Sequence, residues 1–330
     1  MDPVSQGVLG AAWAQPAAGR SRIVAASVIG CIAGMVPDLD FLIRSGTDPL
    51  LAIEFHRHFT HSITFIPFGA LICACLLYPA CKRTLAFRAC YGFSLLGYAS
   101  HGLLDACTSY GTLLFWPFSN ERIAWDLISV IDPLFTIPLI GFVLLAAFRR
   151  RAVFSVIGVC WCLCYLGLGF VQNQRVATVV AGLAATRGHA PGSIETKPTF
   201  GNLLLWKTIY LHEDRYYVDA VRAGFRPRIF EGESRPILDV ERDFPWLAAE
   251  THQWEDVERF RWFADGYLVL DPEVPNRILD LRYSLVPNNA DGFWGIELDA
   301  QAASDAHASY VTLRMRSTEE GRELLRMLFH

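Results

Sequence analysis

Long apolar segments separated by short polar connections dominate the first half of the chain. These segments cover residues at about 23–37, 62–81, 89–107, 127–148 and 152–172. Several approach the roughly 20 residues that a helix needs to cross about 30 Å of hydrocarbon. The pattern therefore predicts an α-helical polytopic membrane domain over residues 1–175, with about five spanning helices.

A shorter apolar segment, rich in small residues, precedes the first long one. It covers residues 4–14 and is followed by Pro16, Gly19 and Arg20. We interpret it as a short N-terminal helix that leads to a turn, from which the 23–37 helix climbs back. On this interpretation Gln6 returns to the level of Asp38. The alternative is an amphipathic helix that lies on the membrane surface.

The pattern changes after the last long apolar segment. Residues 176–196 read as a linker, since Gly188, Pro191 and Gly192 interrupt regular structure. Residues 203–211 and 215–221 flank a polar turn and predict a β-hairpin. Further strands are expected at 259–270, 278–285 and 308–315, with helical character over 240–262. We therefore predict a small soluble α+β domain, mainly β, over residues 197–330.

Composition supports a membrane setting and argues against one class of partner. Of the 330 residues, 52% are hydrophobic and only 19% are charged, which is a membrane-protein balance. The formal net charge of −4 gives no basic surface of the kind that nucleic-acid binding requires. We expect no nucleic acid partner.

Positive residues in the short connections predict the orientation of the membrane domain, because Lys and Arg stay on the cytoplasmic side. Only Arg44, Arg57 and Arg122 lie in the connections of the other face. The C-terminal domain is then extracytoplasmic, on a protein of the bacterial inner (cytoplasmic) membrane. The positive residues of the expected cytoplasmic face are Arg20, Arg22, Lys82, Arg83, Arg88, Arg149, Arg150 and Arg151.

Acidic and histidine side chains gather at the ends of the apolar segments. Ionisable groups at membrane depth are costly and usually functional. By the predicted order of connections, all of these residues lie at the non-cytoplasmic side of the membrane. They are Asp38, Asp40, His56, His58, His61, His101, Asp105, Asp126 and Asp132.

Carboxylates and imidazoles in one place are typical of a site for a divalent metal. They suit Zn²⁺ first, with Mn²⁺ or Fe²⁺ as alternatives. Five or six such ligands exceed what one open zinc site uses, so one ion or two are expected, the latter about 3.5–4 Å apart. A bound ion of this kind activates water and polarises an ester or phosphoryl oxygen.

Each candidate also has a purely structural interpretation. His101 and Asp105, four residues apart on one helical face, could be a hydrogen-bonded pair that fixes helix packing. Asp38 and Asp40 could be solvated at a helix end. His58 is either a ligand or an exposed side chain.

Three further charged residues have roles other than metal binding. Arg57 could reach lipid headgroups or hold a phosphate in bidentate fashion, and the two roles are compatible. Asp126 and Asp132 are expected to orient other ligands or to cap helix N-termini.

Several motifs follow one another along the first half of the chain. They are the opening Met1-Asp2-Pro3-Val4-Ser5-Gln6-Gly7, Pro37-Asp38-x-Asp40, His56-Arg57-x-x-Thr60-His61-Ser62, His101-x-x-x-Asp105-x-x-Thr108-x-Tyr110-Gly111 and Trp116-Pro117-Phe118-Ser119. Together these motifs resemble the membrane-bound metal-dependent hydrolase family, the LexA-regulated inner-membrane hydrolases. The resemblance is dense over residues 1–150 and thin in Leu205-Trp206-Lys207 and Asp280-Leu281-Arg282-Tyr283.

That family is distantly similar to zinc-dependent phospholipase C and to the S1/P1 nucleases, which are helical phosphoesterases with clustered metals. Many of its members have histidine at the position of Gln6. Carried over position by position, the resemblance implies metal binding by Asp40, His56, His61, His101 and Asp105, with Asp38 as a further partner.

Two functional hypotheses follow. The leading one is a membrane-bound hydrolase of a lipid or lipid-linked phosphoester, with a metal-activated water at the outer membrane face. In it Asp38 or Asp105 orients or deprotonates the water and Arg57 steadies the phosphate. The alternative is a non-enzymatic metal-binding membrane scaffold, or a protein that binds an envelope partner.

Overall fold

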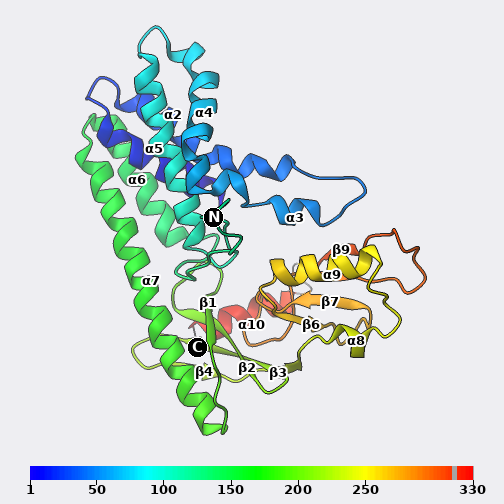
Figure 1. The fold of residues 1–330 in the computed structure, drawn as a ribbon. Helices are drawn as coiled ribbons and strands as arrows, with labels where there is room; N and C mark the ends of the chain where they lie inside the picture. The colour runs from blue at the N-terminus through cyan, green and yellow to red at the C-terminus, as the bar shows by residue number, and fades with distance from the viewer. Residues whose placement is uncertain (314–317, 330) are drawn as a thin grey trace. The chain divides into compact units, whose positions relative to one another are not determined.

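A computed structural model describes residues 1–313 and 318–329, which form two compact units. The first unit comprises Met1–Leu42, Phe55–Val171 and Phe200–Asn202, and the second comprises Ile43–Glu54, Gln172–Thr199 and Leu203–His330. The first unit is built from helices and the second mainly from strands (Figure 1). This division agrees with the predicted order of a helical membrane domain and an α+β domain.

Helices pack against one another throughout the first unit (Figure 1). Short 3-10 helices connect α2 to α4, and the first of these, Val36–Leu42, continues α2 directly. The long helices are α1 (Pro3–Ala14), α2 (Ile23–Met35), α4 (Ile66–Cys81), α5 (Phe87–Ala106), α6 (Pro133–Arg149) and the first part of α7 (Val153–Thr186).

Helix α1 is buried among α2, α5 and α6 rather than lying on a surface. Its closest contacts are made at glycines: a Cβ on Gly10 would lie 2.3 Å from the carbonyl oxygen of Gly30 on α2. A Cβ on Gly97 of α5 would lie 2.3 Å from the same oxygen. Small residues at these crossings let the three backbones touch. The alternative of a surface amphipathic helix is therefore wrong.

The turn after α1 brings the chain back as the sequence predicted. The 3-10 helix Gln15–Ala17 ends α1, and α2 returns along it. The carbonyl of Gln6 packs directly on Gly34 near the end of α2, shortly before Asp38. The predicted return of Gln6 to that level is confirmed.

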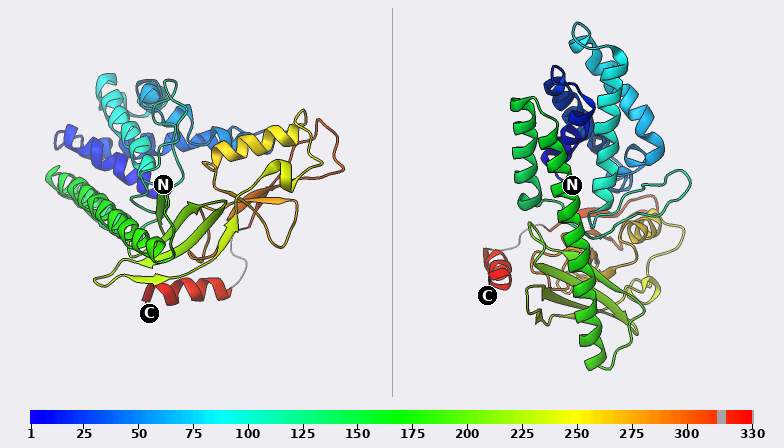
Figure 2. Two further views of the ribbon diagram at one scale, coloured as in Figure 1. Left: turned by 60° about the horizontal axis from the view of Figure 1, so that its bottom comes forward. Right: turned by 90° about the vertical axis from the view of Figure 1, so that its left-hand side faces the viewer.

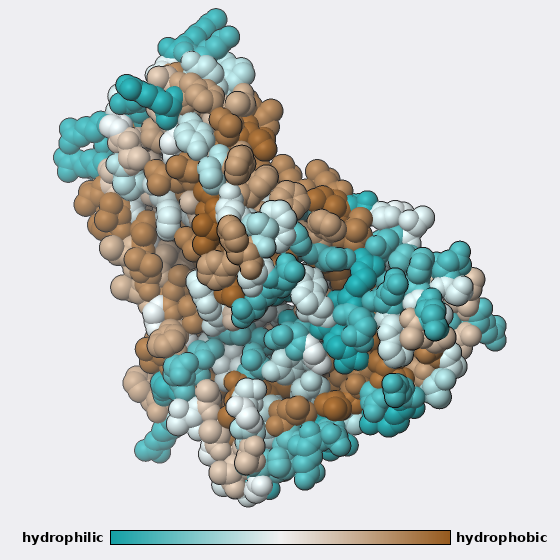
Figure 3. All heavy atoms as spheres, in the orientation of Figure 1, coloured by the Kyte–Doolittle hydropathy of each residue, from teal (hydrophilic) through white to brown (hydrophobic). Residues whose placement is uncertain are grey.

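Among the residues that the structure describes, three helical stretches are long and apolar enough to cross a membrane: Ile23–Leu42, Ile63–Cys81 and Val153–Thr186. Helix α6 is apolar but shorter, and α5 is interrupted by buried polar side chains such as Ser94 and His101. Hydrophobic side chains gather on the visible outer surface of this unit, with hydrophilic ones at the loop ends (Figure 3). A helical membrane unit is thus supported, and the count of about five spans stays a prediction.

The second unit contains two antiparallel sheets. Their facing side chains share one core, in which Ile209 and Val218 of the first sheet meet Val269 and Leu279 of the second. The first sheet has the order β1 (Ile194–Pro198), β2 (Leu205–His212), β3 (Arg215–Arg222) and β4 (Arg228–Phe230), with β5 (Ser234–Pro236) also paired to β3. The second has the order β6 (Leu268–Leu270), β7 (Arg277–Asp280), β8 (Trp294–Glu297) and β9 (Ser309–Thr312).

Helices complete the second unit: α3 (Leu51–Phe55), most of which belongs to it, α8 (Val240–Asp243), α9 (His252–Phe263) and α10 (Thr318–Phe329). Helix α10 lies along the first sheet (Figure 2), where Met327 packs on Leu205 and Ala220. Burial of one apolar face against a sheet is what holds a short helix of this kind in place.

The predicted hairpin is confirmed, whereas the predicted linker over residues 176–196 is wrong at both ends, at 176–186 in α7 and at 194–196 in β1. Strands β2 and β3 pair in register from Leu205 with Arg222 to His212 with Arg215. Helix α7, however, continues unbroken to Thr186. The segment up to that point is rich in alanine and apolar residues, and the first breaker, Gly188, sits just beyond it with φ +76°.

Other expected elements are present with different bounds. The strand predicted over 259–270 begins only at Leu268, because residues up to Phe263 belong to α9. The strands predicted at 278–285 and 308–315 correspond to β7 and β9, and residues 314–315 lie outside the described part of the chain. Helical character over 240–262 is confirmed by α8 and α9.

Candidate metal centre

Three segments of the first unit deliver ionisable side chains to one place. The 3-10 helix that follows α2 carries Asp38 and Asp40. The connection before α4 carries His61, and the last turns of α5 carry His101 and Asp105 on one helical face. The start of α1 contributes further contacts. The convergence predicted from the sequence is thus present for three of the four predicted segments, whereas the segment with Asp126 and Asp132 does not join the cluster.

Four side-chain atoms form the core of this cluster: Oδ1 of Asp38, Nε2 of His61, Nε2 of His101 and Oδ2 of Asp105. All lie within 4.8 Å of one another. The two Nε2 atoms are 2.9 Å apart. The distances from Asp38 Oδ1 are 3.5 Å to His61 and 3.4 Å to His101, and those from Asp105 Oδ2 are 3.2 Å and 3.4 Å.

These spacings match a tetrahedral metal site. A zinc ion with ligands at about 2.0–2.1 Å separates neighbouring ligand atoms by about 3.3–3.4 Å. The five measured separations, from 2.9 to 3.5 Å, lie close to that value. Three of the four side chains, those of His61, His101 and Asp105, are fully buried.

The outer hydrogen bonds of both imidazoles turn their Nε2 lone pairs toward the cluster. Nδ1 of His101 lies 2.6 Å from the carbonyl oxygen of Gly34, which can only accept, so this nitrogen carries the proton. Nδ1 of His61 lies 3.3 Å from Asp40 Oδ2 and 3.0 Å from Thr60 Oγ1. Thr60 Oγ1 donates to Asp40, so it accepts from His61. This pattern is typical of metal-ligating histidines.

Lone pairs therefore converge without a donor between them. Within the described residues, the buried Oδ2 of Asp105 has no hydrogen-bond partner, although both Nε2 atoms lie near it. Buried polar atoms are almost always satisfied. A cation at the centre of the four atoms would satisfy all of them, and the residues present fit one.

Asp40 and His56 lie outside the four-atom core. Oδ1 of Asp40 is 2.8 Å from Nδ1 of His56, and Oδ2 accepts from the backbone N–H of Arg57 at 2.9 Å. With Thr60 and His61 also beside it, Asp40 is arranged to orient His61. The structure brings both residues to the cluster, and their direct metal binding stays a prediction.

Arg57 reaches the cluster from a left-handed backbone position, with φ +62°. Its Nε lies 3.4 Å from Asp105 Oδ2, and its guanidinium donates to Thr108 Oγ1 at 2.8 Å. The same group stacks over the ring of Tyr110, 4.8 Å from its centre. Arg57 is buried, and it places a positive charge beside the acidic residues.

Two groups at the start of the chain bind the other oxygen of Asp105. The Met1 amine contacts Oδ1, and the Gln6 amide donates to it at 2.9 Å. The predicted return of the N-terminal helix placed Gln6 near Asp38, and the family resemblance marked its position, but neither assigned a role to Met1. The matching motif around Met1–Gly7 was the available signal for this segment.

The remaining candidates do not join the core. His58 contacts the aromatic rings of Phe59 and Trp116. Asp132 caps the N-terminus of α6 by accepting from two backbone N–H groups, as predicted for a helix-terminal carboxylate, and accepts from Tyr165. Asp126 is buried at a left-handed position with φ +54°.

A second group of possible ligands, Asp48, Asp256 and His307, lies in the second unit. The Arg259 guanidinium already pairs there with Asp48 at 2.9 Å and with Asp256 at 2.9 Å. It also pairs with Glu54 at 2.7 Å. An arginine supplies the positive charge of this group, which is therefore an ion-pair network.

Comparison with known proteins agrees with the membrane setting. The profile described as YdjM inner membrane protein matches residues 1–176. The uncharacterized protein YfhP of Bacillus subtilis (strain 168) is 32% identical over 126 residues, which is 38% of this chain and 38% of that protein. The inner membrane protein YbcI of Escherichia coli (strain K12) is 33% identical over 109 residues, 31% of this chain and 60% of that protein.

The aligned regions span less than two thirds of either relative. No solved structure matches this chain. The matched residues 1–176 include the whole acidic and histidine cluster and more than half of the 330 residues. The chain therefore belongs to the YdjM inner membrane protein family.

Proposed function

We propose that this inner membrane protein is a metal-dependent hydrolase of a lipid or lipid-linked phosphoester. The observation that carries the proposal is the convergence of two imidazole and two carboxylate lone pairs on one buried point. Mixed nitrogen and oxygen ligands favour zinc, with manganese or iron as alternatives. The ligands would be Asp38, His61, His101 and Asp105.

When bound, the cation would lower the pKa of a water to about 7 and polarise a phosphoryl oxygen. The chain's own residues supply the rest. Asp38 is the most exposed of the four ligands, with a side chain 20% accessible, so its carboxylate borders the open side of the cluster. It is therefore the residue best placed to orient a water or to accept its proton.

Arg57 and Asp105 act together in this proposal. The Arg57 guanidinium lies beside Asp105 and is held by Thr108 and Tyr110, so its position is fixed before a substrate arrives. A guanidinium binds phosphoryl oxygens in bidentate fashion and stabilises the charge that develops on them. Asp105, bound by Met1 and Gln6 on its other oxygen, keeps its orientation as a ligand.

Exposed apolar side chains beside the acidic residues support a lipid substrate. Leu39, Phe41 and Leu42 alternate with Asp38 and Asp40 in sequence, and each of the three is about half exposed or more. Such a surface suits acyl or prenyl chains next to a polar headgroup. The distribution of positive residues supports placing this end of the helices at the outer membrane face.

The non-enzymatic alternative has one observation in its favour. His61, His101 and Asp105 are completely buried, as expected for a closed structural metal site. In that case the metal would hold the helices together, and the second unit would bind an envelope partner.

One experiment separates these possibilities. The purified chain should contain divalent metal, and His61→Ala should lose most of it, because a ligand is removed. His58→Ala is the matched control, since His58 lies in the same segment, packs against the rings of Phe55, Phe59 and Trp116, and is not one of the four core residues. Unchanged metal content in both His61→Ala and Asp105→Ala would refute the site itself.

The same preparations should then be tested on phospholipids, nucleotides and polyprenyl phosphates. Turnover by the wild type and by His58→Ala, but not by His61→Ala, is the result expected of a hydrolase. Metal binding without turnover of any of these substrates would favour the scaffold.

A further inference from the structure

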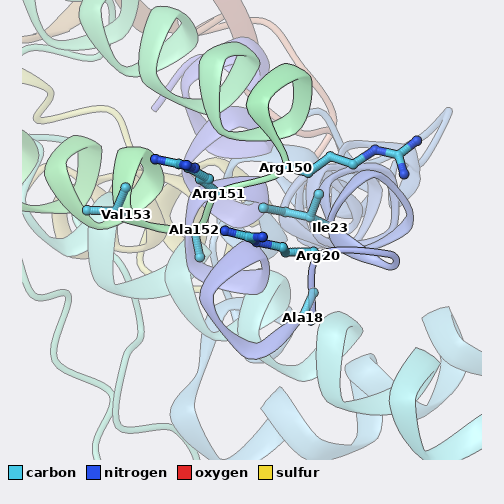
Figure 4. A pocket seen from close by; sticks show the side chains of 8 residues that line it. Ala18, Arg20, Ile23, Arg150, Arg151, Ala152 and Val153 are labelled. Atoms are coloured by element: carbon cyan, nitrogen blue, oxygen red, sulfur yellow. The ribbon is translucent and has the colours of Figure 1, made fainter.

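A basic pocket opens at the other end of the first unit, between two connections that are distant in sequence (Figure 4). One wall is the turn from α1 to α2, and the other is the turn from α6 to α7. The pocket has a volume of about 560 Å³. Its lining consists of Ala18, Gly19, Arg20, Ile23, Arg150, Arg151, Ala152 and Val153.

No acidic residue lines this pocket, although three arginines do. Throughout residues 1–313 and 318–329, no ion pair or side-chain hydrogen bond engages the guanidiniums of Arg20, Arg150 or Arg151. In the view of Figure 4, Arg20 and Arg151 extend in the same direction from opposite connections, and Arg150 extends the other way. Positive charges gathered without a counter-charge repel one another and attract an anion.

The local backbone supports the placement of these arginines. Arg150 ends α6 in a left-handed conformation with φ +52°, which glycine usually occupies. The turn that results brings Arg151 to the pocket directly before α7 begins at Val153. Two arginines thus flank one tight turn.

The surroundings of the pocket are apolar and continue onto membrane-crossing helices. Ile23 and Val153 line the pocket itself. One turn further along, Val28 of α2 and Val156 and Ile157 of α7 are exposed. Both helices belong to the stretches that are long enough to span a bilayer. A ligand with an anionic head and a hydrocarbon tail would satisfy both parts of this surface.

We propose that the pocket binds the phosphate of an anionic phospholipid headgroup. Guanidinium groups hold phosphate oxygens in bidentate fashion, which a single ammonium cannot do. Basic pockets between membrane helices on the cytoplasmic side are suited to such headgroups, and this is the side that the positive residues predict. The bound lipid would join the α1–α2 and α6–α7 connections. This inference goes beyond the proposed hydrolase and does not depend on it.

The test is lipid binding to the full chain, freed of lipid in detergent, by native mass spectrometry. Phosphatidylglycerol and cardiolipin should bind at least about tenfold more tightly than phosphatidylcholine. The Arg20→Gln, Arg151→Gln double variant should lose that preference. The Arg83→Gln, Arg88→Gln variant removes the same charge at exposed positions outside the pocket and should keep it.

The proposal would be overturned if both double variants lost the preference for anionic lipids to the same extent. It would also be overturned if the wild type bound phosphatidylcholine as tightly as phosphatidylglycerol. Displacement of phosphatidylglycerol by inorganic phosphate at the same concentration would also overturn it, because the occupant would then be a soluble anion. Far-UV circular dichroism and the elution volume in size-exclusion chromatography serve as the folding controls for each variant. The Arg20→Lys, Arg151→Lys variant keeps the charge and should bind with intermediate affinity, since the bidentate geometry is lost.

Discussion

At the scale of single residues, Asp40 contacts the outer nitrogen of His61, whereas the four-atom core is formed by Asp38, His61, His101 and Asp105. It holds the Nδ1 side of His61, accepts from Thr60 and from the Arg57 backbone, and leaves His61 Nε2 facing the cluster. The sequence could not reveal this division of roles. Arg57 has a positive φ between His56 and His61, so neither helix nor strand periodicity predicts which way the two rings face.

Asp40→Asn is expected to weaken the site rather than abolish it. Loss of an orienting partner of this kind typically lowers metal affinity about 10–100-fold. The metal affinity of Asp40→Asn is measured by titration against a competing chelator. His61→Ala is measured in the same way for comparison, and it should bind far less metal because a ligand is removed. If Asp40→Asn behaves like His61→Ala, Asp40 is itself a ligand, as the family resemblance implied.

Lys207 in the second unit provides a prediction about pH. It is fully buried on β2 and donates to Ser284 Oγ at 2.8 Å and to the Asn289 carbonyl at 2.7 Å. Burial lowers the pKa of Lys207 to about 7, against the opposing effect of Asp291 and Asp280. The unfolded chain then binds one more proton than the folded chain between pH 7 and about pH 10.

The free energy of unfolding should therefore rise with pH across that window, at up to about 1.4 kcal/mol per pH unit from this group. Below pH 7 the lysine is charged in both the folded and the unfolded state, so the folded state bears the full free-energy cost of burying that charge. Lys207→Met removes the titrating group and should remove this slope. Denaturant unfolding at pH 7, 8 and 9 gives the free energy of unfolding of both proteins. The same pH dependence in the wild type and in Lys207→Met would contradict a lowered pKa of Lys207.

At the scale of elements, prediction succeeded where the local sequence determines the conformation. The β2–β3 hairpin has a short polar turn, and Glu213 takes the left-handed conformation that such a turn needs. The end of α7 was placed too early because an alanine-rich segment can continue a helix or begin a linker. Strand β8 was not predicted because its four residues, from Trp294 to Glu297, are too few to show alternation.

Helix α9 carries two arginines that should differ strongly in their importance. Arg259 pairs with Asp256, whose side chain is fully buried, and with Asp48 and Glu54 of the 43–54 segment. Within residues 1–313 and 318–329, Arg261 pairs only with the exposed Glu258, one turn away. Exposed pairs contribute about 0–1 kcal/mol, whereas breaking a network around a buried carboxylate costs about 1–3 kcal/mol after allowing for the partial exposure of Arg259.

Arg259→Met should therefore increase hydrogen exchange in residues 48–54, and Arg261→Met should leave it unchanged. The 43–54 segment is packed into the second unit through these ion pairs, so their loss would free it first. Equal exchange in the two variants would show that apolar packing, rather than Arg259, holds the segment.

At the scale of the whole molecule, the sequence predicted which residues would meet but not how each would bind. Three separated segments with acidic or histidine residues at corresponding ends of apolar helices can converge only if the helices pack side by side. That convergence is confirmed for Asp38, His61, His101 and Asp105. The contributions of Met1 and Gln6 depend on the glycine contacts that bury α1, whereas the small residues of this segment predicted only its return to the level of Asp38.

Because the ligands come from separate segments of the first unit, metal removal should loosen that unit and leave the second unchanged. A ligand present at 1,000 times its dissociation constant stabilises the state that binds it by about 4 kcal/mol. Treatment with a chelator should therefore increase hydrogen exchange at the end of α2, around His61 and at the end of α5. Amides of the β2–β3 hairpin should exchange at their former rate, since this hairpin lies in the other unit.

His101→Ala provides the control for this experiment, because a site without that ligand has little metal to lose. Its exchange should be fast in the same three segments before chelation and unchanged afterwards. A chelator that removes metal from the wild type without changing exchange in these segments would place the bound ion elsewhere. The four side chains would then be a hydrogen-bonded group that fixes helix packing, which was the structural alternative for His101 and Asp105.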